Sequence, residues 1–136
     1  MPRGEVTVTT VVGLPVEEAF TLFTERIDRW WVRPAGTATG SVVRFEGGRL
    51  VAVTSQGVEV LASVASWDPP ALLELDWSGP HAQPGDRVTI EFEPEPAGTR
   101  VTVRHHREGV RPEETTAAVL GLWWGSVLSR FASRRP

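Results

Sequence analysis

DRVTIEFEPEPAGTRVTVRHHRE, residues 86–108, holds two alternating segments on either side of a turn rich in proline and glycine. Within 88–92 and 101–105, every second residue is apolar or, once, a histidine. Because successive side chains of a strand point to opposite faces, this spacing predicts a β-hairpin with one buried face. The set expected to point inward is Val88, Ile90, Phe92, Val101, Val103 and His105.

Further strands are predicted on the N-terminal side of this hairpin. A Gly-Gly pair at 47–48 joins two of them, and an Asp-Pro-Pro turn at 68–70 joins two others. Because short turns connect these segments, we expect one antiparallel sheet of about six or seven strands. The predicted ranges are 5–13, 41–46, 49–55, 57–67 and 71–78.

Helices are predicted at both ends of this series of strands. Pro15 as first helical residue, followed by Glu17 and Glu18, predicts a helix start, with a second short helix after Thr24. Pro112 opens a longer helix in the same way. Its apolar stripe recurs at helical spacing and predicts packing across the concave face of the sheet. The stripe is Leu120, Trp124, Val127, Leu128 and Phe131, whereas Trp123 falls beside it. We expect an α+β fold and a single domain over 1–136.

Composition excludes several functional classes. The net charge of −3 and the pI near 5.6 leave no basic stripe for nucleic acid. The chain has no Cys for disulfides or thiolate metal sites, no Lys for Schiff bases and no Tyr acid. It has no apolar run long enough to span a bilayer and no signal-peptide pattern at its start, so we expect a cytoplasmic protein. The absence of Lys, Asn and Tyr is typical of a GC-rich bacterial genome.

The order of these elements and four motifs resemble the START-like (SRPBCC) superfamily, which has a helix-grip fold. The similarity is strongest to its branch named for homologues of the activator of the heat-shock-protein-90 ATPase. The motifs are PVEEAFTLFTERIDRWW, SVASWDPPALLELDWS, TIEFEPEPAGTRVTVRHHREG and GLWWGSVLSRF. The resemblance implies a cavity between the last helix and the sheet, used by relatives for hydrophobic or amphipathic small molecules. Some relatives are cyclases, aromatases or hydrolases.

Two pairs of adjacent tryptophans, at 30–31 and 123–124, point to such a cavity. Adjacent residues of a helix point about 100° apart, so the two rings of a pair cannot enter one core layer. We therefore expect at least one ring of the first pair at the cavity mouth, with ordinary core packing as the alternative. The residues predicted to line the cavity are Phe23, Trp30, Trp31, Leu75, Trp77, Phe92, Val103, His105, Leu120, Trp124 and Val127.

His105 is the one titratable residue that the alternation directs inward, while its neighbour His106 points outward. It is either a hydrogen-bonded structural residue or a polar anchor for a ligand. The carboxylates of the strands, Glu74, Asp76 and Glu91 among them, should face solvent, so no second titratable group is expected beside it. We assign no catalytic residue, no metal ligand and no cofactor.

Three hypotheses follow. The first is a domain that binds a hydrophobic or aromatic small molecule, with His105 as polar anchor. The second is an enzyme of the cyclase, dehydratase or hydrolase kind, with His105 as acid or base; a carboxylate or arginine beside His105 would favour it. The third is a chaperone-linked protein that activates a heat-shock-protein ATPase. A homodimer through the outer sheet edge or Trp123 is left open.

Overall fold

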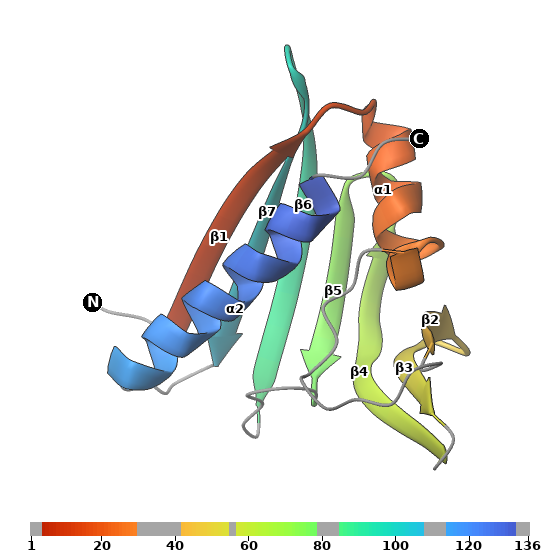
Figure 1. Cartoon of the computed structure of the whole chain (residues 1–136), viewed down its shortest axis with the longest axis vertical. Helices are drawn as coiled ribbons and strands as arrows, with labels where there is room; N and C mark the ends of the chain where they lie inside the picture. Colours follow the sequence, from red (N-terminus) through yellow and green to blue (C-terminus); the bar gives the residue numbers. More distant parts are fainter. Residues whose placement is uncertain (1–3, 30–41, 55–56, 79–84, 108–113, 133–136) are drawn as a thin grey trace.

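Seven antiparallel strands form one curved sheet in the order β1-β7-β6-β5-β4-β3-β2 (Figure 1). The computed structural model of the chain describes residues 4–29, 42–54, 57–78, 85–107 and 114–132. The predicted antiparallel sheet is confirmed, with boundaries within a few residues of those expected. The strands are β1 (Gly4–Val12), β2 (Val42–Glu46), β3 (Arg49–Thr54), β4 (Gly57–Asp68), β5 (Leu72–Trp77), β6 (Asp86–Glu95) and β7 (Gly98–Arg107).

The β6–β7 hairpin contributes six side chains to the inner face of the sheet. Val88 pairs with His105, Ile90 with Val103 and Phe92 with Val101. All six side chains are buried, which confirms the predicted inward set. Burying one Ile or Phe side chain contributes roughly 1.5–3 kcal/mol, so this face is a major part of the hydrophobic core.

The helix α2 (Glu114–Ala132) crosses the sheet over β1, β7 and β6 (Figure 1). Trp124, Val127, Leu128 and Phe131 are fully buried, as the predicted stripe requires. The side chains of Leu120 and Trp123 lie outside the described part of the structure. Within the described residues, no helix combines the length and the apolar character needed to cross a membrane.

The helix α1 (Val16–Thr24) and the short 3-10 helix η1 (Ile27–Arg29) close the other end of the core. Pro15 is the residue before the helix instead of its first residue, a shift of one position from the prediction. The ring of Phe23 contacts Phe92 and Phe131 at centroid distances of 5.5 and 5.4 Å. These edge-to-face contacts join α1, β6 and α2 into one aromatic cluster.

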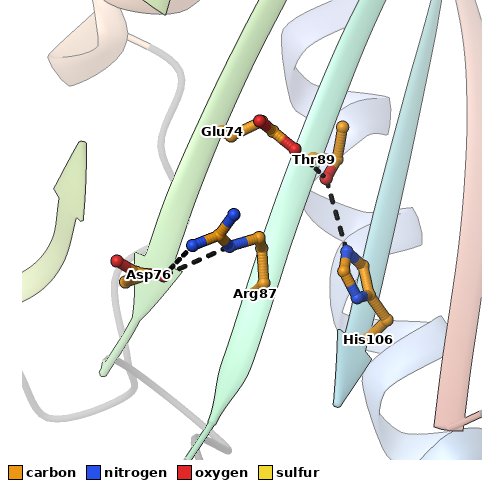
Figure 2. A network of polar contacts seen from close by, with 5 residues as sticks. All are labelled: Glu74, Asp76, Arg87, Thr89 and His106. Atoms are coloured by element: carbon orange, nitrogen blue, oxygen red, sulfur yellow. Dashed lines mark hydrogen bonds and ion pairs between the residues drawn. The ribbon is translucent and has the colours of Figure 1, made fainter. Parts of the chain in front are cut away.

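The outer face of the sheet carries a network of polar side chains on β5, β6 and β7 (Figure 2). Arg87 donates to Asp76 at 2.9 Å, and the hydroxyl of Thr89 lies 3.3 Å from Glu74 and 3.4 Å from His106. The expectation that these carboxylates and His106 point away from the core is therefore confirmed. Arg104 and Glu91 form a further ion pair, both side chains being partly exposed.

Gly98 begins β7 where the chain passes close to the end of β1. It has φ +140°, and a Cβ there would overlap the carbonyl oxygen of Val12 and lie 3.0 Å from the Cα of Gly13. Thr99, the next residue, donates its buried hydroxyl to the Leu14 carbonyl at 2.8 Å. Gly98 is thus required both for its backbone conformation and for the close approach of β1.

We predict that Gly98→Ala lowers the free energy of unfolding by at least about 3 kcal/mol, because conformational strain and a backbone clash add. Gly47→Ala is the matched control. Gly47 also has a positive φ, +59°, but a Cβ there meets no described atom within 4 Å. It should cost only about 1–2 kcal/mol. Urea unfolding followed by circular dichroism measures both, and equal losses would contradict the assigned clash.

Candidate functional site

A chain of three buried polar side chains connects α2 to the sheet. Nε1–H of Trp124 donates to Nδ1 of His105 at 3.0 Å, and Nε2 of His105 lies 2.9 Å from Oδ2 of Asp86. The three residues come from α2, β7 and β6, and none is more than 3% exposed. We call Asp86, His105 and Trp124 the polar triad.

The triad fixes where the protons lie. An indole nitrogen can only donate, so Nδ1 of His105 must accept and carries no proton. A neutral imidazole then has its proton on Nε2, which donates to the Asp86 carboxylate. His105 is therefore neutral in this arrangement, and Asp86 accepts its hydrogen bond. A second proton on His105 would point at the Trp124 N–H and break that hydrogen bond.

Asp86 corrects the expectation that no titratable group accompanies His105. It is the first residue of β6 and shares the inward parity of Val88 and Ile90. Because Val88 pairs with His105, Asp86 is the diagonal neighbour of His105 on the same face. The predicted strand 86–95 already began at Asp86, but the inward set was counted from its first apolar residue, Val88. Extending the alternation by one step would have placed Asp86 on the inner face.

Trp77 completes a cluster of rings around the triad. Its centroid lies 5.3 Å from that of Trp124 and 6.2 Å from that of His105. The sequence predicted Trp77 inward together with Leu75, and both are buried. Three rings from β5, β7 and α2 thus meet between the helix and the sheet. We call Trp77, His105 and Trp124 the ring cluster.

The other residues predicted to line a cavity divide into two groups. Phe23, Leu75, Phe92, Val103 and Val127 are buried between the helices and the inner face of the sheet, none more than 2% exposed. They belong to the same hydrophobic core as the rings of Trp77 and Trp124. Trp30 and Trp31 lie outside the described residues, as does the side chain of Leu120. That these residues line a ligand cavity stays a prediction.

The geometry limits the hydrogen bonds that His105 can make to a ligand. Both ring nitrogens are engaged, one by Asp86 and one by Trp124. A ligand group that hydrogen-bonds to His105 at Nδ1 must therefore displace the indole of Trp124. In the described part of the chain, no group of three or more His, Asp or Glu side chains is arranged to hold a metal ion.

Comparison with protein families matches residues 13–134 to the family described as activator of Hsp90 ATPase homolog 1-like protein. The chain belongs to this family. The resemblance drawn from the four motifs is thereby confirmed. No curated protein sequence matches the chain.

Several solved structures share the fold. Protein MLL2253 from Mesorhizobium loti is 20% identical, with a TM-score of 0.67 over 94% of this chain and 93% of that one. The Aha1 dimer from Colwellia psychrerythraea is 14% identical, with a TM-score of 0.62 over 94% and 92%. DynU16, from the dynemicin biosynthetic locus, is 25% identical, with a TM-score of 0.68. The match covers 96% of this chain but only 46% of DynU16.

We predict that Asp86→Ala lowers the free energy of unfolding by about 2–4 kcal/mol, since it leaves the buried Nε2–H of His105 without its acceptor. Asp76→Ala is the control. It removes an outer-face carboxylate whose ion pair with Arg87 is partly exposed on both sides, and should cost less than about 1 kcal/mol. Urea unfolding at neutral pH measures both. A loss at Asp86 no larger than at Asp76 would show that the triad adds nothing to stability.

We also predict that His105 is observed as the neutral Nε2–H tautomer. The variant with His81→Gln and His106→Gln leaves His105 as the one histidine of the chain. A long-range ¹H–¹⁵N spectrum of its imidazole at neutral pH then reports one protonated and one unprotonated nitrogen. Protonation at Nδ1 would be incompatible with the Trp124 hydrogen bond.

Proposed function

We propose that this protein binds an apolar or aromatic small molecule between α2 and the sheet, next to the ring cluster. The observation that carries the proposal is the ring cluster itself, in which two indoles and an imidazole from three elements meet below the helix. Aromatic faces offer a large contact area for a flat apolar ligand at a small cost in conformational entropy.

The polar triad supports binding in a second way. The hydrogen bond from Trp124 to His105 holds the indole in one orientation before any ligand arrives. When a contact residue is already ordered in the free protein, less conformational entropy is lost on binding. In this role Asp86 and His105 position Trp124, and a ligand needs no direct bond to His105.

The comparisons are compatible with this role. DynU16, whose sequence is 25% identical to this chain, comes from the dynemicin biosynthetic locus. A shared fold alone does not determine function, so the ligand has to be identified by experiment.

The neutral fluorophore N-phenyl-1-naphthylamine tests this proposal. We expect a saturable rise in its emission on titration with the protein. Trp124→Phe should weaken its binding about five- to tenfold, because an aromatic contact and the triad hydrogen bond change together. Val58→Ala, which alters an exposed residue of β4 outside the ring cluster, should leave the affinity unchanged.

Nuclear magnetic resonance of the unmodified protein gives an independent readout. The methyl signals of Val103 and Val127, both buried next to the ring cluster, should shift as the fluorophore is added. Absence of saturable binding, or shifts confined to other methyl groups, would refute the proposed location.

Acid–base catalysis is a second candidate, favoured specifically by Asp86. A carboxylate 2.9 Å from Nε2 orients the imidazole and stabilises its protonated form, as a general base requires. Reaction at Nδ1 then requires Trp124 to move away from His105. Turnover of a bound compound that His105→Gln abolishes without weakening binding would establish this alternative.

Protein partners are the remaining part of the proposal. Activation of a heat-shock ATPase stays a prediction from the family name alone. A homodimer is suggested by the dimeric relative from Colwellia psychrerythraea and by Leu122, which is 77% exposed on α2. Sedimentation velocity measures the oligomeric state directly.

A further inference from the structure

A cavity lies at the tip of the β2–β3 hairpin. Its volume is about 300 Å³, and it is lined by Phe45–Arg49 of the hairpin and by Val64 and Trp67 of β4. It lies at the β4–β3–β2 side of the sheet, which α2 does not cross (Figure 1). We call this cavity the hairpin notch.

The backbone explains why the notch is open. The register of β4 shifts between Val64 and Ser66, and the hairpin ends at this point, where the Val64 N–H donates to the Gly48 carbonyl at 2.8 Å. The last residues of β4 therefore extend beyond β3. Gly47 and Gly48 both have positive φ, and neither has a side chain that would fill the space.

Trp67 forms one wall of the notch and is 45% exposed, unlike the buried Trp77 and Trp124. Its ring is held from two sides by edge-to-face contacts with Phe20 at 5.5 Å and with Phe45 at 5.6 Å. A half-exposed indole held in this way is a ready surface for stacking by a flat molecule.

The charges around the notch favour an anion. Glu46 is neutralised by Arg44, whose Nε lies 2.6 Å from its carboxylate. Arg49 also lines the notch, and its guanidinium has no ion-pair partner among the described residues. Guanidinium binds carboxylates in a planar, two-pronged geometry and tolerates an adjacent aromatic ring.

We propose that the hairpin notch is a second binding site, for a small planar aromatic carboxylate that stacks on Trp67 and pairs with Arg49. The two features select different parts of the ligand, the ring by stacking and the acid group by charge. This site does not depend on the function proposed for the ring cluster.

Matched ligands and matched variants test the proposal. By isothermal titration calorimetry, 2-naphthoate should bind with one-to-one stoichiometry and about tenfold more tightly than the neutral 2-naphthamide. Arg49→Gln should remove this preference by weakening 2-naphthoate about tenfold. Arg87→Gln, a change of an outer-face arginine that pairs with Asp76 and does not line the notch, should weaken it less than twofold.

Trp67→Leu should weaken 2-naphthoate about tenfold or more, since its ring stacks on the indole. Because Trp67 is half exposed, this variant is expected to fold, and its melting curve checks that directly. Three results would overturn the proposal: no saturable binding of 2-naphthoate, equal affinity for the acid and the amide, or binding lost in Trp124→Phe and kept in Trp67→Leu. The last of these would assign the ligand to the ring cluster instead.

Discussion

The hydrogen bond between Trp124 and His105 is the contact on which the arrangement of helix and sheet depends. Apolar packing alone is non-directional and would tolerate a helix shifted or rotated by a fraction of a turn. A buried donor and acceptor do not tolerate this, because each costs about 1–3 kcal/mol when left unpaired. The Trp124 indole has its acceptor in β7, and β6 supplies the carboxylate that holds the acceptor in its tautomer. The triad therefore fixes the position of α2 on a face that is otherwise almost entirely apolar.

The same contact determines which function the geometry favours. A general base needs a free nitrogen beside the substrate, and His105 has none while Trp124 stays in place. A binding wall needs rings in fixed orientation, which the triad supplies. Catalysis would require the helix to give up the bond that positions it, whereas binding against the indole face would not. This asymmetry is why we place ligand binding before acid–base chemistry, although Asp86 is the partner that a catalytic histidine would have.

Most of the fold could be predicted because apolar residues recur at every second position in the strands and at every third or fourth position in the helices. Both patterns are strong signals of secondary structure. The alternation of Val88, Ile90 and Phe92 predicted β6 and its buried face, and that of Val101 and Val103 predicted the inward direction of His105. The same alternation extends to Asp86, but a carboxylate at the first position of a strand is usually solvated, so its burial was not expected. That Asp86 meets His105 follows from the pairing of Val88 with His105, which depends on the tertiary structure. Trp67 was beyond prediction for a related reason. Its exposure depends on where the neighbouring hairpin ends, which its own strand does not encode.

The two tryptophan sites differ in a way that has chemical consequences. At the ring cluster the indole nitrogen is saturated by His105 and the surroundings are buried, so a ligand there gains mainly from apolar contact and loses if it carries a charge. At the hairpin notch the indole is half exposed and an arginine lies at the rim, so a carboxylate keeps its hydration on one side and gains a cation on the other. A neutral aromatic compound should therefore prefer the site below α2, and its carboxylated analogue the notch. One chain would then discriminate a neutral and a negatively charged derivative of the same ring system by position.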